Sequence, residues 1–590
     1  MKDFLKYTLA TVVGIFLFTI IMGIFMIISI VGMVASGDQT AVVKENSVLV
    51  LDLSGMMEER VEDNIIAQLK GQASGATGLD VTLSAIKKAQ VNDKIKGIYI
   101  EAGAFAPDSY ASMQAIRNAL ADFKKSGKWI VAYGDSYTQG AYYVASIADK
   151  VYLNPQGIID WHGIASQHVF LKDVMEKFGV KMQVSKVGAY KSATEAFTGD
   201  KMSDADREQT EAYINGIWQN VTQAVSASRK VSVATLNQYA DSLITFAAPE
   251  DYIKMHMADQ LLYTDQVKAE IKKRLGIKED KQINQLSVSD MEGVATVNNN
   301  GEEIAVYYAY GDIVDGAEGR LMANTHQINA QVVCKDLEDL MNDDDVKAVV
   351  LRVNSGGGSA YASEQIWHQI SELKKKKPIV VSMGGMAASG GYYISAPANW
   401  IVAEPTTLTG SIGIFGMFPD MSGLLTQKLG VKFDEAKTNK NSSFGSIARP
   451  FNAEEMGILQ QYIDRGYSLF RKRVADGRKM TTEQVEAIAQ GRVWLGQDAM
   501  KIRLVDQLGG LDQAVAKAAA LAKLKDYHTT SYPEPADWTL QLIDKLQGSS
   551  YLDEQMRLTL GDYYSLFTTM RTMNQQAAIQ ARVPYYIIIK

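Results

Sequence analysis

The stretch VSMGGMAASGGYYISAPANWIVAEP, residues 381–405, repeats an earlier part of the same chain. That earlier part is VAYGDSYTQGAYYVASIADKVYLNP, residues 131–155, and the two align without a gap at an offset of 250. The glycines, the Tyr-Tyr pair and the final Pro coincide. Because a shared pattern of this length specifies a shared local structure, we expect both stretches to fold alike.

The similarity extends in both directions. Upstream, IKGIYIEAGAFAPDSYAS (95–112) lies over VKAVVLRVNSGGGSAYAS (346–363), and downstream KFGVKMQVSK (177–186) resembles KLGVKFDEAK (428–437). Solenoid repeats have much shorter periods, so we interpret the chain as a duplicated domain. We predict three parts: a tail and membrane anchor (residues 1–36), a first repeat (37–297) and a second repeat (298–590). We expect a linker between the repeats at Asn298–Glu303.

Within each repeat, short apolar runs alternate with helical patterns. AVVLRV (348–353) and PIVVSM (378–383) have the length and continuity of buried parallel strands. Between them, residues 359–377 have apolar positions three and four apart and end in lysines, as a helix does. Strand, helix and strand in this order predict an α/β fold with parallel sheets and flanking helices in both repeats.

Composition excludes several classes of protein. The net charge of −7 gives no reason to expect nucleic acid as a partner. Cys334 is the single cysteine, which excludes an intrachain disulfide. The six histidines stand in no recognisable triad or H-E-x-x-H context, and the glycine-rich turn lacks the G-K-[ST] of a phosphate loop. We therefore expect neither a metal nor another cofactor.

Residues 8–34 form an uncharged apolar segment of 27 residues. As a helix it would be about 40 Å long, enough for the hydrocarbon core of a bilayer and too long for a cleavable signal peptide. Lys2 and Lys6 precede it, whereas Asp38 is the first charge after it. The positive-inside rule then predicts a single-pass anchor with the rest of the chain outside the cytoplasm.

The two repeats differ at the positions where catalytic residues are expected. Ser389, after a strand and before an apolar helix, lies over Gln139. Three glycines, 356–358, lie over Phe-Ala-Pro at 105–107, and proline has no N–H to donate. We therefore expect a nucleophilic serine in the second repeat. Backbone donors for an oxyanion would come from Gly357, Gly358 and Gly390. Tight packing and a flexible turn are the structural alternatives.

A base for this serine is harder to find. Lys191, within VGAYKSATEAF, occupies the position that Ser442 has in the second repeat. A lysine among small and aromatic residues becomes a base near neutral pH when burial lowers its pKa. From the segment alone, an ordinary solvated surface lysine is the default interpretation, because lysines are almost never buried.

Together these motifs resemble signal peptide peptidase A in its long, two-repeat form. The resemblance rests on RVNSGGGSAYAS, MAASGGYYISAPA, TGSIGI, GAYKSATEAF and GRVWLGQDAMKIRLVDQLGG, which span almost the whole chain in order. It implies a Clp/crotonase-like fold and endoproteolysis by a Ser–Lys dyad of Ser389 and Lys191. Ser411, where the first repeat has Trp161, matches a serine that orients the lysine. Gly356 departs from the proline often found there.

The resemblance also implies substrates, assembly and compartment. The substrates would be remnant signal peptides or similar hydrophobic peptides, and the chains would form a homo-oligomer, a tetramer, at the periplasmic face of the inner membrane. Two other functions stay open: a crotonase-like acyl-CoA enzyme, and a catalytically inactive scaffold tethered to the membrane. The sequence also leaves open whether Lys191 meets Ser389 within one chain or between chains.

Overall fold

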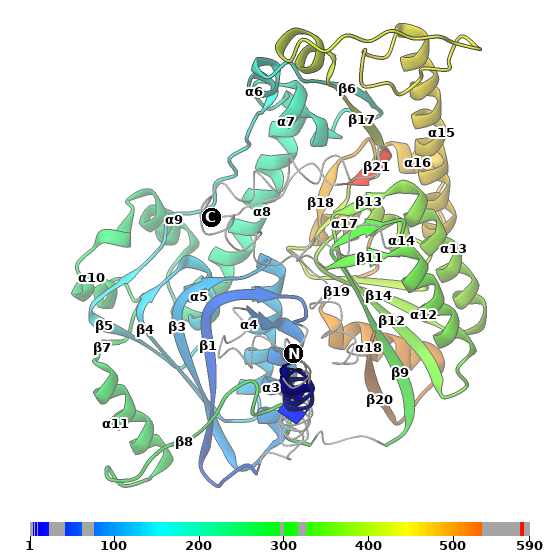
Figure 1. Cartoon of the computed structure of the whole chain (residues 1–590). Coiled ribbons are helices and arrows are strands. Elements are labelled where there is room, and N and C mark those ends of the chain that lie inside the picture. Colours follow the sequence, from blue (N-terminus) through cyan, green and yellow to red (C-terminus); the bar gives the residue numbers. More distant parts are fainter. Residues whose placement is uncertain are drawn as a thin grey trace.

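We describe a computed structural model of the chain (Figure 1). It describes residues 4, 6–8, 10–19, 21–22, 42–61, 76–295, 300–316, 326–533 and 579–582. Of the predicted anchor, residues 8, 10–19 and 21–22 are among these; they are helical and exposed, and the rest of 8–34 lies outside the described residues. None of the helices within the described part of the chain is both long and apolar enough to cross a bilayer.

The first repeat is built on a seven-stranded sheet in which every described pairing is parallel. Its main path, in spatial order, is β2 (Ala76–Gly78), β1 (Ser47–Glu58), β3 (Ile95–Ala106), β4 (Trp129–Tyr137), β5 (Lys150–Ile159) and β7 (Gln260–Leu261). Strand β8 (Asn284–Leu286) also pairs with β1.

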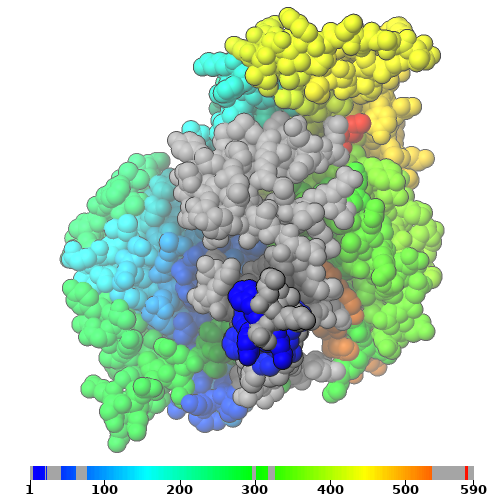
Figure 2. Space-filling view, viewed as in Figure 1, coloured from blue at the N-terminus to red at the C-terminus, as the bar shows by residue number. Residues whose placement is uncertain are grey.

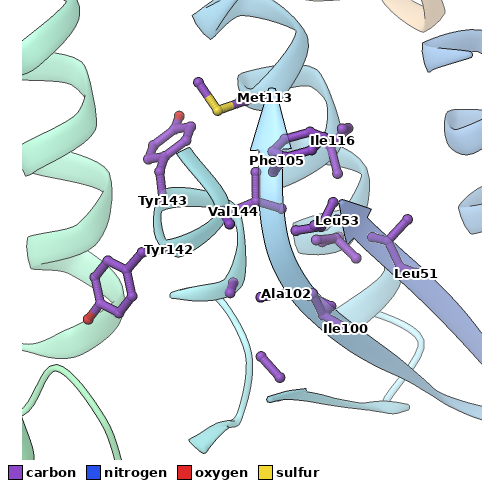
Figure 3. Close-up of a cluster of buried hydrophobic side chains, with 14 of the residues drawn as sticks. Leu51, Leu53, Ile100, Ala102, Phe105, Met113, Ile116, Tyr142, Tyr143 and Val144 are labelled. Atoms are coloured by element: carbon purple, nitrogen blue, oxygen red, sulfur yellow. The ribbon is translucent and has the colours of Figure 1, made fainter. Parts of the chain in front are cut away.

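Helices pack on this sheet. They are α3 (Leu79–Val91), α4 (Tyr110–Lys124), α5 (Gln139–Ala145), α8 (Asp204–Arg229), α9 (Val233–Asp241), α10 (Pro249–Lys254) and α11 (Thr264–Leu275), with short turns α6 (Lys172–Lys177), η1 (Ser192–Thr194), α7 (Glu195–Thr198) and η2 (Ile244–Phe246). Figure 3 shows part of the core that they form, where Leu53 of β1, Phe105 of β3 and Ile116 of α4 are buried. Burying such side chains is the main stabilising contribution to the fold.

The second repeat has the corresponding sheet, with eight strands. Its main path is β18 (Val493–Leu495), β16 (Leu408–Gly410), β14 (Ile379–Ala388), β12 (Val346–Ser355), β9 (Glu302–Tyr310) and β20 (Tyr527–Tyr532), and β15 (Trp400–Ala403) pairs with β14 and with β19 (Gln507–Leu508). Following the pairings, β20-β9-β12-β14-β15-β19 matches β8-β1-β3-β4-β5-β7 of the first repeat. The predicted α/β fold, with adjacent parallel strands at 348–353 and 378–383, is confirmed.

The helices of the second repeat are α12 (Ala330–Asn342), α13 (Ala360–Lys376), α14 (Gly390–Ser395), η3 (Gly423–Lys428), α15 (Ala453–Arg478), α16 (Thr482–Glu486), α17 (Gly496–Lys501) and α18 (Leu511–Ala522). Helix α13 is the one predicted at 359–377. It begins where the Ser359 side chain accepts a hydrogen bond from the N–H of Ala362, and lysines fill its last turn. Both features stabilise a helix end.

A third sheet combines segments from both repeats. Its six strands, in order, are β11 (Gln327–Asn329), β10 (Asp312–Val314), β13 (Gly357–Ser359), β21 (Ile579–Arg582), β17 (Phe415–Asp420) and β6 (Lys181–Lys186). In Figure 1 this sheet extends from the second repeat to the upper part of the view, where β6 and β17 lie. Strand β6 belongs to the first repeat and ends shortly before Lys191. Its pairing with β17 therefore brings this part of the chain against the second repeat.

The repeats are also joined by buried polar contacts. The Arg352 guanidinium, on β12, binds the Glu59 carboxylate at 2.6 Å between Nε and Oε1, and both side chains are 4% exposed. Asn354 donates to the same carboxylate. Charge-assisted pairs of this geometry fix the relative position of the elements that carry them.

One sequence similarity does not extend to the structure, and one expected boundary is different. Residues 177–186 and 428–437 are similar in sequence, yet β6 is a strand while 432–437, which the structure describes, is an exposed loop. Strand β6 pairs with β17, and a partner edge of this kind decides whether such a segment becomes a strand. The predicted linker is also shorter, because Glu302 and Glu303 already belong to β9.

Candidate active site

Ser389 stands at the junction between strand β14 and helix α14, fully buried. Its backbone has φ 54° and ψ −115°, a conformation that non-glycine residues rarely adopt. The N–H of Ser389 donates to the carbonyl of Gly410 at 2.8 Å. Gly391 follows where an added Cβ would lie 2.6 Å from the carbonyl oxygen of Ser355, so the small residues of the motif allow this tight turn. Strained residues of this kind cluster at functional sites.

Lys191 of the first repeat meets this serine inside the same chain. Its Nζ lies 2.7 Å from Oγ of Ser389, although the two residues are 198 positions apart. Lys191 is fully buried, whereas the long side chain of a lysine ordinarily keeps its ammonium group in water. The structure therefore answers the question that the sequence left open, since one chain supplies both groups.

Burial lowers the pKa of Lys191 well below its ordinary value of 10.5. Removing an ammonium from water disfavours the charged form, so the amine is neutral over a wider pH range. The remaining neighbours of Nζ belong to Ser411, whose Oγ lies at 3.0 Å and whose carbonyl oxygen lies at 3.1 Å. A neutral amine has two N–H donors and one lone pair. In the neutral form of the amine, the two acceptors on Ser411 can take both donors, which leaves the lone pair for the Oγ–H of Ser389.

The backbone around Lys191 is fixed by the second repeat. The N–H of Tyr190 donates to the carbonyl of Gln490 at 3.0 Å. Gly188, at φ 100°, allows this approach, because a Cβ there would lie 2.4 Å from the same carbonyl oxygen. Gly491 lies against Lys191 in the same way. These close approaches fix the backbone from which the lysine side chain reaches Ser389.

Polar side chains support the loop from the opposite side. Gln209 of α8 donates from Nε2 to the carbonyl of Tyr190 at 3.1 Å and to Oγ of Ser192 at 3.0 Å. Its Oε1 accepts from the N–H of Val493 in the second repeat at 3.2 Å. Ser192 in turn donates to Asp206 at 2.7 Å. These buried side chains connect the lysine loop, α8 and β18, and satisfied networks of this kind rigidify a site.

The glycine turn contacts the start of α14, next to Ser389. Gly357 has φ 102°, and a Cβ on it would be 2.7 Å from the N of Gly390, so the turn and the start of α14 are in direct contact. The N–H of Gly357 already donates to Oγ of Ser355 at 3.1 Å. Gly358 belongs to β13, where it pairs with Ile313 and Ala581. Gly357 is thus placed against Gly390, the residue after Ser389, and Gly358 follows it in β13.

The equivalent place in the first repeat is filled. Gln139, which corresponds to Ser389, is buried and donates to Tyr110 and to the carbonyl of Gly163. Trp161, which corresponds to Ser411, is fully buried against Tyr142 and Trp218. The first repeat therefore has packing side chains where the second repeat has Ser389 and Ser411, as the comparison of the repeats predicts.

The structure brings Ser389, Lys191 and Ser411 together and places Gly357 against Gly390, while Gly358 follows Gly357 in β13. Sequence reasoning missed the residues that hold the lysine loop, namely Ser192, Asp206, Gln209 and Gly491. Gly491 and Ser192 carried a signal, because Gly491 opens the quoted motif GRVWLGQDAM and Ser192 follows Lys191 in GAYKSATEAF. A buried hydroxyl, a neutral amine and adjacent backbone donors are the groups required for acyl transfer through a covalent intermediate.

Comparison with known protein families also indicates a protease with two similar halves. The profile of Peptidase family S49 matches twice, over residues 122–278 and 371–525. The Clp protease profile matches residues 300–401. The repeated match falls once on each repeat, as the duplication predicts.

Similar proteins cover most of the chain. Protease 4 of Salmonella typhi is 38% identical over 90% of this chain and 87% of its own length. Protease 4 of Haemophilus influenzae is 33% identical over 95% and 90%. The chloroplastic serine protease SPPA of Arabidopsis thaliana is 30% identical over 86% and 74%. Neither the acyl-CoA function nor the scaffold function gains support from these similarities.

Proposed function

The chain belongs to peptidase family S49 and is a serine protease, and from this premise we propose that it is a membrane-anchored endopeptidase with a Ser389–Lys191 dyad. The observation that carries the dyad is the 2.7 Å separation of Nζ and Oγ, with Nζ buried. The proposed domains are those of the sequence: residues 1–36, 37–297 and 298–590.

The mechanism follows from the groups around Oγ. Neutral Lys191 takes the proton of Ser389 as the oxygen attacks the peptide carbonyl, and Ser411 keeps the lone pair directed at Oγ. The backbone N–H groups of Gly390 and Gly358 stabilise the oxyanion, because the N–H of Gly357 already donates to Ser355. Protonated Lys191 then gives its proton to the leaving amine, and water hydrolyses the acyl-enzyme by the same route.

The proposed substrates are remnant signal peptides and similar hydrophobic peptides. Support comes from the resemblance of the motifs to signal peptide peptidase A and from the apolar segment at residues 8–34, which would hold the enzyme at the bilayer. The lysines before this segment favour a periplasmic location for the catalytic region. Fusion of a periplasm-dependent reporter after residue 533 tests this orientation, and an inactive reporter would contradict it.

We also propose a homo-oligomer, a tetramer. A projecting arm, made of residues 172–186 and 415–447, carries apolar side chains in water: Phe178 (64% exposed), Leu429 (65%), Phe433 (49%) and Ile447 (55%). It forms the upper part of Figure 2, in cyan and yellow. Exposed apolar side chains gathered on one element mark interaction surfaces. Light scattering of the detergent-extracted full chain measures the number of copies; a monomer would refute the assembly.

The function is tested with the full chain and a fluorogenic signal-peptide-like substrate. Ser389→Ala and Lys191→Ala should each lower kcat/KM by at least about 10⁴-fold. Ser371→Ala, at a half-buried serine that donates to a carbonyl within α13, is the matched control and should retain activity. A fluorophosphonate should label the wild type and not Ser389→Ala. Retained turnover in the folded dyad variants would refute the proposed mechanism.

A further inference from the structure

Asp206, in the first turn of α8, is a fully buried carboxylate beside the lysine loop, residues 188–192. Its Oδ1 accepts from Oγ of Ser192 at 2.7 Å and from Nε2 of Gln209 at 3.1 Å. Its Oδ2 lies 3.1 Å from Nδ1 of His168, whose side chain is 6% exposed. A carboxylate removed from water needs donors on both oxygens, and these three side chains supply them.

The side chains of Ser192, Asp206 and His168 form a row that is not a second catalytic triad. In a triad the imidazole lies between the hydroxyl and the carboxylate, whereas here the carboxylate lies between the other two groups. Nε2 of His168 lies 3.2 Å from Oγ of Ser166, so both ring nitrogens have a partner. The hydroxyl of Ser192 has no imidazole to take its proton, and the row holds a position instead.

One contact of the carboxylate leads to the base. Ser192 directly follows Lys191, and its N–H donates to the carbonyl of Tyr190 at 2.9 Å. Gln209 donates to the same carbonyl at 3.1 Å. The residues on both sides of Lys191 are thus bound by side chains that Asp206 orients.

The other contact leads to the strands beside the nucleophile. Because Nε2 of Gln209 faces the carboxylate, its Oε1 is turned toward β18 and accepts from the N–H of Val493 at 3.2 Å, where α8 runs beside that strand (Figure 1). Val493 pairs with Gly410 of β16. The carbonyl of Gly410 accepts from the N–H of Ser389, and the next residue is Ser411. One carboxylate therefore connects the base to the backbone that holds both serines.

The second repeat uses the same helix position differently. Helices α8 and α15 both have 26 residues, and their third residues are Asp206 and Glu455. Glu455 caps its own helix, because its carboxylate accepts from the N–H of Asn452. In the first repeat the equivalent N–H, that of Ser203, donates to Glu195 instead. The carboxylate of Asp206 is therefore directed to the lysine loop and not to the end of its own helix.

We propose that Asp206 is a positioning residue of the dyad, whose Oδ1 holds the lysine loop through Ser192 and the β16–β18 strand pair through Gln209. This inference rests on the proposed serine protease mechanism. Because Asp206 is fully buried, it acts through these residues and not on the substrate. Its loss should therefore change kcat and the surroundings of Nζ of Lys191, while KM changes little.

Asp206→Ala in the full chain tests this. We expect kcat to fall about 10²-fold, the effect of a misplacement of about 1 Å. Burial lowers the pKa of Lys191, so water admitted by a loosened loop should raise it, and the lower limb of the pH profile of kcat should move to higher pH. Asp206→Asn should retain most of the activity, because its amide oxygen still accepts from Ser192 and Gln209 and its amide N–H can donate to Nδ1 of the other tautomer of His168. A loss in Asp206→Asn equal to that in Asp206→Ala would overturn positioning through Oδ1.

Glu455→Ala is the matched control, because it removes a carboxylate from the same position of α15. It should lower the Tm through loss of the helix cap and leave kcat and the pH limb in place. Here kcat is counted per serine labelled by a fluorophosphonate, so unfolded protein does not contribute. An unmoved limb in Asp206→Ala, or an equal shift in Glu455→Ala, would overturn the inference.

Ser192→Ala is a smaller change that removes only the hydroxyl between Asp206 and the lysine loop. It should move the limb in the same direction, with a smaller loss of kcat. If Asp206→Ala yields no folded protein, Ser192→Ala decides, and an unmoved limb would overturn the inference. A wild type that neither hydrolyses peptide nor reacts with the fluorophosphonate would refute the proposed function, whereas an active wild type with unmoved limbs in the variants refutes the role of Asp206 alone.

Discussion

Gly491 of the second repeat lies in contact with the backbone of Lys191 of the first. A Cβ on Gly491 would be 2.7 Å from both the N and the Cβ of Lys191, and the φ of Gly491 is 80°. The contact places the lysine from one repeat beside the serine of the other. The position of the base is therefore set by a residue with no side chain.

Gly491→Ala should displace Lys191 and lower kcat by about 10²-fold, the effect of a misplacement of about 1 Å. The control is Gly127→Ala, because Gly127 has φ 79° and nothing within 4 Å of the added Cβ. Both variants carry the same backbone strain, so the difference in kcat isolates the contact with Lys191. Equal activities would show that the contact does not position the base.

Ser411→Ala removes one of the two acceptors that orient Nζ of Lys191. With the carbonyl of Ser411 remaining at 3.1 Å, we expect a fall in kcat of about 10–100-fold and little change in KM. The lower limb of the pH profile of kcat should also move, because the environment of the amine changes. Ser371→Ala should leave that limb in place. A fall in activity with an unmoved profile would point to a purely structural role.

The lowered pKa of Lys191 predicts how both activity and stability depend on pH. Activity should persist well below pH 10.5 and fall with unit slope as the amine is protonated. Between the lowered pKa and 10.5, the unfolded state binds a proton that the native state does not, so the free energy of unfolding should rise with pH. Urea unfolding of Lys191→Met, compared at neutral and alkaline pH, should lack this rise. The same slope in both proteins would contradict the assignment.

Glu404, at the junction of the repeats, predicts the opposite effect: a free energy of unfolding that falls as pH rises. Burial raises its pKa from 4.5 to about 7, and Arg352 only partly offsets the effect. The native state holds a proton that the unfolded state releases, so unfolding should become easier as pH rises from 4.5 to about 7, by about 3 kcal/mol in total. Glu404→Gln should remove this dependence, as measured by urea unfolding across that range.

The buried pair of Glu59 and Arg352 should matter far more than an exposed one. Glu59→Ala leaves the Arg352 charge buried without its partner and should cost about 3–5 kcal/mol of the free energy of unfolding. The double variant Glu59→Met, Arg352→Met should recover most of that loss. Lys87 and Asp512 also join the repeats but are 67% and 69% exposed, so Lys87→Ala should cost no more than about 1 kcal/mol. Equal losses would show that burial does not govern the pair.

Comparing the chain with itself predicted the architecture and half of the site. The offset of 250 predicted the two sheets, and Gln139 opposite Ser389 singled out the serine. Lys191 was assigned through resemblance, because its burial depends on contacts with Gln490 and Gly491 that no local pattern encodes. The same reason hid β21, whose four residues become a strand only because the edges of β13 and β17 accept them. Pairings between distant segments decide structure where local preference is weak.

The 198 positions between Lys191 and Ser389 have a consequence for biosynthesis. At about 5–20 residues per second, a ribosome adds the serine about 10–40 s after the lysine. Throughout that interval the nascent chain holds a base without a nucleophile, and the nucleophile gains its base only when the second repeat docks. A chain truncated before Ser389 therefore lacks the dyad. Protease activity reports that synthesis and docking are complete.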